Sequence, residues 1–423
     1  MELIIRNAKL REKNDLVDIG IENGKFKAIE KRIEAKGKEE IDAKGNLVSS
    51  PFVDTHLHLD YVLTVGNPRH NLTGTLLEGI EIWGETKKLL TKEQIKKNAI
   101  EGIKWEVANG VTKIRTHADA TDPTLTTVQA LLEVKEEMKD YVDIQIVAFP
   151  QDGIYTYGSS EKLMEQAMEM GCDVVGGIPH TELTREDGVK DVEFAFKLAK
   201  KYNGLIDLHI DETGDPNSRF VEVLAKEAIV NGMEGKVSAS HVTAMHNYNN
   251  DYAFKLLGIL KRAGVNVIVN PFDNSVLQNR WDSYPRGRGI ARVDELLARG
   301  VNVSVGHDSI MDPWYPLGKG SMLHAANLLL HFAHLSGYEE LPKVFDMITV
   351  NGAKTLNEED LYGIEVGKNA DCIVLDAKDE LEAIRIMSEC LYVVKNGKII
   401  CKTTPAKREV NIGGQISNVD FKI

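Results

Sequence analysis

Residues 51–60 read PFVDTHLHLD, and this stretch decides the fold that we predict. An apolar run that begins at Phe52 ends in two histidines one residue apart, His56 and His58. Side chains at positions i and i+2 of a strand project from the same face, so both imidazoles can reach one metal ion. Two alternating histidines also occur as ordinary polar residues at a strand end. The metal interpretation therefore depends on residues further along the chain.

Downstream of this stretch, an apolar strand, a polar residue and an amphipathic helix follow one another repeatedly. Four of the helices end beside a glycine in the position of a C-terminal cap, namely Gly204, Gly232, Gly264 and Gly300. We count eight apolar strands, which predicts an α/β fold, a closed (β/α)8 barrel of the TIM type. The strands are expected at 47–58, 111–119, 143–151, 172–180, 205–212, 236–242, 265–271 and 301–308. A doubly wound open sheet is the alternative, but no glycine-rich phosphate motif follows the first strand.

Both ends of the chain carry hairpin signals. An Asn-Gly pair at 23–24 and another at 396–397 each lie between alternating apolar runs, as in two-residue hairpins. We therefore expect a small β-sandwich domain assembled from residues 1–50 and 356–423, beside a barrel domain of residues 51–355. Two unrelated terminal hairpins would give the same pattern.

Composition narrows the classes of partner. The chain has 51 Lys and Arg against 64 Asp and Glu, a formal net charge of −13, which argues against nucleic acid. Its four cysteines are scattered without a C-x-x-C pair, as in a reducing compartment. The first residues lack the features of a signal peptide, and no apolar run reaches the roughly 18 residues of a membrane span. A cytoplasmic protein with no membrane partner is expected.

Polar side chains end each of the predicted strands. The carboxyl ends of barrel strands carry the active site in such folds, so these side chains should converge. They are His56 and His58, His117, Gln151, His180, His209 with Glu212, His241, Asn270 and Asp308. Three ring nitrogens and one carboxylate suit a single Zn²⁺ or Fe²⁺ ion, and they would come from His56, His58, His209 and Asp308. Such an ion lowers the pKa of bound water to near 7, so the site is expected to hydrolyse its substrate.

Other polar residues near these strand ends are less easily assigned. Glu212, three residues past His209, and His241, at the end of the next strand, are candidates for acid and base catalysis. His117 and His180 fit either a structural or a functional role. A further set is expected to be structural because it falls in a helix-like run, and it consists of His324, His331 and His334.

Long stretches of this sequence resemble the amidohydrolase superfamily and, within it, the bacterial cytosine deaminases. They include PFVDTHLHLD, GTLLEGIEIW, IKWEVANG, IRTHAD, QIVAFPQDGI, DVVGGIPHTELTREDGV, LIDLHIDE, SASHVTAMHNYN and GHDSIMDPWYPLG. The matches run in order through nearly the whole chain. The resemblance implies a metal-dependent (β/α)8 hydrolase with a flanking β-sandwich, and a homo-oligomer.

The resemblance also implies a mechanism. The metal, usually iron or zinc, would be held by His56, His58, His209 and Asp308. Metal-bound hydroxide would attack the amidine-like carbon of a small cyclic substrate, and ammonia would leave. Glu212 would carry a proton to the neighbouring ring nitrogen, His241 would orient the hydroxide, and Asp308 would also move protons. Since the third strand offers Gln151 and no lysine that could bridge two ions, one metal should suffice.

The substrate implied first is cytosine, converted to uracil and ammonia in pyrimidine metabolism. Gln151 would hydrogen-bond the ring, and Phe149 and Trp314 would pack around it. The pattern of bacterial cytosine deaminases has two consecutive aspartates after the eighth strand, whereas here Ser309 follows Asp308. A shorter, neutral serine should enlarge the pocket, which favours 5-methylcytosine, isoguanine or creatinine as alternatives. A catalytically silent scaffold is disfavoured, because such relatives lose metal ligands and this chain keeps all four.

Overall fold

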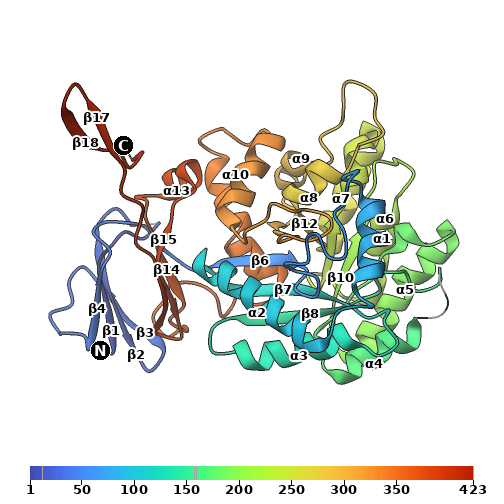
Figure 1. The fold of residues 1–423 in the computed structure, drawn as a ribbon, viewed down its shortest axis with the longest axis horizontal. Coiled ribbons are helices and arrows are strands. Elements are labelled where there is room, and N and C mark those ends of the chain that lie inside the picture. The colour runs from blue at the N-terminus through green and yellow to red at the C-terminus, as the bar shows by residue number, and fades with distance from the viewer. Residues whose placement is uncertain (12, 157, 159, 423) are drawn as a thin grey trace.

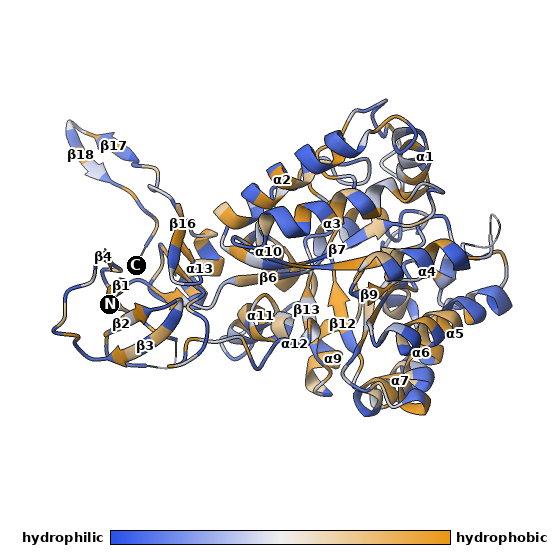
Figure 2. Ribbon diagram, turned by 90° about the horizontal axis from the view of Figure 1, so that it is seen from below, coloured by the Kyte–Doolittle hydropathy of each residue, from blue (hydrophilic) through white to orange (hydrophobic). Residues whose placement is uncertain are grey.

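Eight parallel strands form the centre of the computed structural model, which describes residues 1–11, 13–156, 158 and 160–422 (Figure 1). They lie side by side in chain order: β6 (Phe52–Leu57), β7 (Val111–Asp119), β8 (Asp143–Phe149), β9 (Val174–Val175), β10 (Leu205–Ile210), β11 (Val237–His241), β12 (Asn266–Val269) and β13 (Val303–Val305). Nearly all of their residues are buried, and Figure 2 shows β12 as apolar, as expected for strands covered on both faces.

The first and last strands of this sheet meet and close the barrel. The backbone N–H of His58 donates to the carbonyl of Asp308 at 3.1 Å, and the N–H of Asp308 donates to the carbonyl of His56 at 2.8 Å. Leu57 and Asp308 form a parallel bridge at the same place. The predicted closed barrel is confirmed, and its closure brings the first and eighth strand ends together.

Helices surround the barrel (Figure 1). They are α1 (Leu76–Thr86), α2 (Lys92–Ala108), α3 (Thr126–Met138), α4 (Glu161–Met170), α5 (Arg185–Tyr202), α6 (Phe220–Asn231), α7 (Asn250–Ala263), α8 (Pro271–Leu277), α9 (Val293–Ala298), α10 (Met322–Phe332), α11 (Leu341–Met347) and α12 (Val350–Thr355). Two short 3₁₀ turns, η1 (Pro179–Thr181) and η2 (Thr243–Asn247), follow β9 and β11. Among the described residues, no helix is both long and apolar enough to cross a membrane.

The predicted glycine caps are confirmed for three of the four helices. Gly232 and Gly264 cap α6 and α7 with φ of 61° and 59°, the left-handed region that glycine enters without steric cost. Helix α5 is different, because Asn203 takes the left-handed position at φ 52° and Gly204 follows it. Asparagine is among the few side chains that tolerate this region. Gly300 follows Arg299 with a φ of 71° and is the left-handed residue that ends α9, as predicted.

Two four-stranded sheets built from both termini pack beside the barrel, as predicted for the fold class. One has the order β3-β2-β1-β4, and its strands are β1 (Leu3–Ala8), β2 (Val17–Glu22), β3 (Lys25–Glu30) and β4 (Glu39–Asp42). The other has the order β16-β15-β14-β5, and its strands are β5 (Val48–Ser49), β14 (Cys372–Leu375), β15 (Cys390–Lys395) and β16 (Lys398–Lys402). Residues of both sheets share one apolar core. The domain boundaries after residues 50 and 355 stay a prediction.

The Asn-Gly pairs form the two predicted hairpin turns. Asn23 and Gly24 join β2 to β3 with φ of 53° and 71°, and Asn396 and Gly397 join β15 to β16 with φ of 48° and 75°. Positive φ at both central residues is the requirement of a type I′ turn. Helix α13 (Glu380–Ile386) lies between β14 and β15.

A separate hairpin near the C-terminus extends away from the sheets (Figure 1). It consists of β17 (Glu409–Ile412) and β18 (Gln415–Asn418), and all of their residues are exposed. The sequence reasoning did not predict these two strands.

Candidate metal centre and substrate pocket

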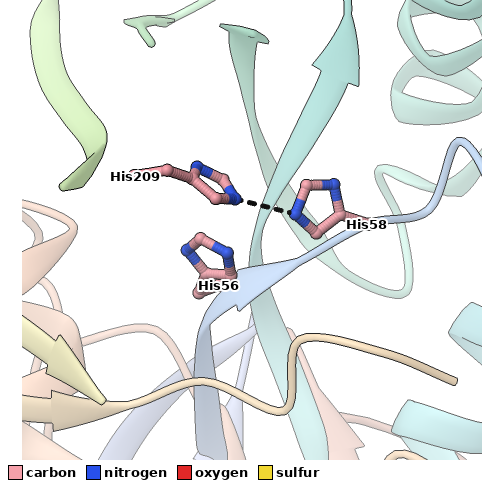
Figure 3. A group of neighbouring side chains, drawn as sticks. All are labelled: His56, His58 and His209. Atoms are coloured by element: carbon pink, nitrogen blue, oxygen red, sulfur yellow. Dashed lines mark hydrogen bonds between the residues drawn. The ribbon is translucent and has the colours of Figure 1, made fainter. Parts of the chain in front are cut away.

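Three histidines from two barrel strands point toward one another (Figure 3). His56 and His58 come from β6 and its end, and His209 comes from β10. Nε2 of His58 lies 3.2 Å from Nε2 of His209. All three rings are buried, and burial together with the neighbouring imidazoles holds the pKa of His209 well below its ordinary value. A neutral ring keeps one nitrogen free to bind a metal.

Asp308 joins this group from the segment after β13. Its Oδ1 lies 3.5 Å from Nε2 of His56 and 3.7 Å from Nε2 of His58. Burial favours the neutral acid, but the adjacent histidine rings outweigh it and hold the pKa of Asp308 below its ordinary value. The backbone φ of Asp308 is 71° and that of His241 is 72°. Left-handed backbone in non-glycine residues is strained and gathers at functional sites.

A hydrogen-bonded chain supports His56 from below. The Ser240 hydroxyl donates to Asp207 Oδ1 at 2.6 Å, and Arg115 donates to the other carboxylate oxygen at 3.0 Å. The Ser240 oxygen is then left to accept from His56 Nδ1–H, 2.9 Å away. This arrangement leaves the lone pair of His56 Nε2 directed at the group, as second-layer partners of metal ligands commonly do.

The four residues fit a metal ion. Nε2 of His56 and Nδ1 of His209 are buried without a hydrogen-bond partner among the described residues. Ligand atoms held at about 2.1 Å by one tetrahedral ion lie roughly 3.4 Å apart. This is close to the 3.2 Å between Nε2 of His58 and Nε2 of His209, and to the 3.5 Å and 3.7 Å from Asp308 Oδ1 to Nε2 of His56 and of His58. One ligand atom from each of His56, His58 and His209 falls within 4.8 Å of the others, and the same holds for His56, His241 and Asp308.

Two acid and base candidates stand beside this group. Burial and the charge of Asp308 raise the pKa of Glu212 well above its ordinary value, although Gln278 donates to its Oε1 at 3.2 Å. Burial therefore favours the protonated form of the Glu212 carboxyl group. His241 Nδ1 lies 3.7 Å from Glu212 Oε1 and 3.8 Å from Asp308 Oδ2, and Asn274 Nδ2 lies 2.8 Å from it. The expected acid and base residues thus face the metal ligands.

A small pocket opens beside the group and is lined by His58, His209, Glu212, His241 and Asp308. Of the residues predicted to bind substrate, Gln151, Ser309 and Trp314 also line it. Phe149 does not. Its ring stacks on that of His209 at 4.1 Å, so its contact is with a candidate metal ligand.

Sequence reasoning missed part of this pocket. His180, whose pKa burial lowers to about 4, lines the cavity, as do Tyr61 and Asp273. His117 does not line the cavity, and the centre of its ring lies 4.2 Å from that of His56. The position of His180 at a strand end was a usable signal, whereas Asp273 follows β12 by four residues and nothing in its spacing indicated that it would turn inward. His324 and His331 lie on α10, whereas His334 lies in the turn that follows the helix, and the cavity is lined by none of the three.

The chain belongs to the amidohydrolase family, whose model matches residues 39–401. This family and the barrel define a hydrolase of the deaminase kind, with a cluster of histidines and an aspartate that could hold a metal ion, so the suspected superfamily is confirmed.

Particular relatives agree with this class. The structure of 5-methylcytosine deaminase from Klebsiella pneumoniae, liganded with 5-fluorocytosine, is 44% identical in sequence. It superposes with a TM-score of 0.93 over 95% of this chain and 98% of its own. N-isopropylammelide isopropyl amidohydrolase of Pseudomonas sp. (strain ADP) is 36% identical over 95% of this chain and 97% of its own. Pterin deaminase of Rhizobium rhizogenes is 27% identical over 88% of this chain and 84% of its own.

Proposed function

We propose that this chain deaminates a cytosine ring and turns over 5-methylcytosine in preference to cytosine. The observation that carries the proposal is Ser309, which lines the cavity next to the candidate ligand Asp308. A hydroxymethyl side chain leaves room for a methyl group on the ring edge that faces it. The similarity to the Klebsiella 5-methylcytosine deaminase supports the same substrate class. Plain cytosine, expected first from the sequence, becomes the poorer substrate in this proposal.

The metal would be held by His56, His58, His209 and Asp308, with Fe²⁺ and Zn²⁺ as the two candidates. A divalent ion at such a site makes hydroxide available at neutral pH and polarises the carbon under attack.

The residues of the chain would position the ring and move protons. Gln151 would hydrogen-bond the ring carbonyl and its adjacent nitrogen. Protonated Glu212 would give its proton to the ring nitrogen beside the reacting carbon, while Gln278 holds its carboxyl group in place. His241 would orient the attacking oxygen. Asp308 would accept the proton that the attacking water loses and pass it to the exocyclic amine, so that the C–N bond breaks and ammonia leaves.

The apolar wall of the pocket would hold the ring flat. Trp314 donates through Nε1 to the carbonyl of Leu76 at 3.2 Å, which fixes the indole across the mouth of the cavity. Its ring meets that of Tyr61 at 4.6 Å, and Tyr61 stacks on His58 at 4.5 Å. An aromatic wall anchored to a candidate ligand suits a small planar substrate better than a flexible one.

The test is ammonia release by the metal-loaded protein with separate substrates. We expect kcat/KM for 5-methylcytosine to exceed that for cytosine by about 10-fold or more, the usual effect of one methyl group in a fitted pocket. Isoguanine, creatinine and N-isopropylammelide should be poor substrates. A higher kcat/KM for any of these three than for both cytosines would contradict the proposal.

A further inference from the structure

A buried carboxyl group with little hydrogen-bond support lines the substrate pocket. Asp273, the third residue of α8, lines the cavity and is 2% exposed. Neither of its carboxyl oxygens makes a hydrogen bond of ordinary geometry with a described residue. Unpaired buried carboxyl oxygens are costly, so their retention calls for a role.

Ser309 adjoins this carboxyl group. The serine is also 2% exposed and lines the same cavity. Its hydroxyl lies close to the carboxyl groups of Asp273 and Asp312, where it partly offsets the rise in pKa that burial causes at each. The two aspartates differ in the backbone hydrogen bonds that their carboxyl groups accept. Asp312 Oδ1 accepts from the backbone N–H groups of Trp314 and Tyr315 at 2.9 Å and 3.0 Å. Asp273 has no such backbone donors, and of the two aspartates only Asp273 lines the cavity.

The strand order fixes which side of the substrate this carboxyl group would meet. Asp273 follows β12, and β8, which precedes Gln151, lies four strands away in the eight-stranded barrel. Strands four apart in a closed ring of eight are opposite one another. A ring held by Gln151 on one wall therefore presents its far edge to Asp273 and Ser309.

We propose that Asp273 is a specificity-determining residue that acts as one unit with Ser309: the carboxyl group that faces the far edge of the ring is carried on residue 273 instead of residue 309. The inference deepens the proposed function and rests on it for the identity of the ring. The carboxyl group, set back behind the small serine, keeps the pocket end polar while leaving room for a ring substituent.

Repulsion between buried carboxyl groups explains why an aspartate at position 309 would be unfavourable while Asp273 is present. Asp308 and Asp312 already lie near Asp273, and after burial their negative charges are the main reason that its pKa is raised well above the ordinary value. An aspartate at position 309 would bring another carboxyl group into the same desolvated space. Like charges in such a space are strongly unfavourable.

The experiment is a double-mutant cycle on the metal-loaded protein, with Ser309→Asp, Asp273→Val and the double variant. We expect Ser309→Asp alone to lower kcat/KM for both cytosine and 5-methylcytosine at least tenfold and to lower the melting temperature. In the Asp273→Val background the same change should restore turnover of cytosine more than that of 5-methylcytosine. Additive effects of the two substitutions on both readouts would overturn the proposal.

Two further variants serve as a conservative substitution and as a control. Asp273→Asn keeps the shape of the side chain and should change the ratio of the two kcat/KM values, whereas an unchanged ratio would count against the proposal. Asp191→Asn removes a buried aspartate that does not line the cavity, and it should leave that ratio unchanged. Coupling in the melting temperature needs no substrate. If no variant deaminates either cytosine, the proposed function fails while the coupling of residues 273 and 309 is still decided.

Discussion

Two polar layers, one above the other, lie inside the same barrel and differ in how completely they are paired. In the lower layer Arg115 donates to Gln145, Asp207, Ser238 and the carbonyl of Thr355, at 2.9 to 3.2 Å. Two residues further along β7 and β10 lie His117 and His209 of the upper layer, where several ring nitrogens have no partner in the described structure. Paired polar groups hold a barrel together, whereas unpaired ones in the next layer mark where a ligand belongs.

Removing a metal ligand should break the upper layer alone. We expect His58→Gln to lower kcat roughly 10⁴-fold and to abolish stoichiometric metal binding, because the ion supplies several kcal/mol to the transition state. Metal content and ammonia release measure the two effects. The exposed His331→Gln should change neither. Full activity in His58→Gln would show that His58 is no ligand.

Breaking the lower layer should instead cost stability. Arg115 is fully buried, and Arg115→Met would leave Asp207 charged and uncompensated, which costs about 3–5 kcal/mol. Denaturant unfolding measures this loss. The double variant Arg115→Met/Asp207→Leu should regain part of it. An Arg115→Met protein as stable as the parent would remove the structural role given to this layer.

Glu212→Gln should separate chemistry from binding. The amide cannot transfer a proton, so kcat should fall by about 10²- to 10⁴-fold while the metal remains bound. Steady-state kinetics and metal analysis check the two parts, with Glu93→Gln on the exposed face of α2 as the control. Undiminished kcat would exclude Glu212 as the proton carrier.

Ser240 and Ser238 allow the two layers to be compared with the same substitution, because both serines lie on the same face of β11. Ser240 supports His56 in the upper layer, and Ser238 accepts from Arg115 in the lower one. We expect Ser240→Ala to weaken metal affinity by about 10- to 100-fold and Ser238→Ala to leave it unchanged. Competition with a metal-binding dye measures both. Equal effects would mean that the two layers are not distinct.

The smallest effect concerns Glu106 on α2, a third kind of buried polar group. Burial, with a contribution from Asp54, raises the pKa of Glu106 well above its ordinary value. The folded state keeps this proton at pH values at which the unfolded chain ionises. The contribution of Glu106 to the free energy of unfolding is therefore greatest below about pH 4.5 and falls as pH rises.

One such group contributes up to about 1.4 kcal/mol per pH unit until its folded pKa is reached. Glu106→Gln should flatten the decline in unfolding free energy between pH 6 and 8, as measured in denaturant. An unchanged slope would show that Glu106 ionises in the folded protein.

Much of the barrel could be predicted from the sequence, because buried parallel strands produce apolar runs that end in polar residues. The order of those runs then placed His56, His209 and Asp308 at one end of the barrel, where the structure brings them together. Both Asn-Gly turns were equally readable, since only a few residues accept positive φ at two successive positions.

The remaining features depend on contacts that no local pattern encodes. Asp273 enters the pocket because α8 begins directly after β12 and turns its third residue inward. Phe149 alternates onto the face that meets His209, whereas the resemblance had suggested contact with substrate. The support of His56 by Ser240 and Asp207 joins strands far apart in the sequence, so only the assembled barrel reveals it.

Reconstitution of metal-free protein tests the central claim most directly. The protein would be stripped with a chelator, and Fe²⁺ or Zn²⁺ added back in steps while ammonia release from 5-methylcytosine is followed. We predict no turnover without metal, full turnover at about one ion per chain, and a melting temperature that rises with the ion bound. Undiminished turnover by the stripped protein would contradict the account.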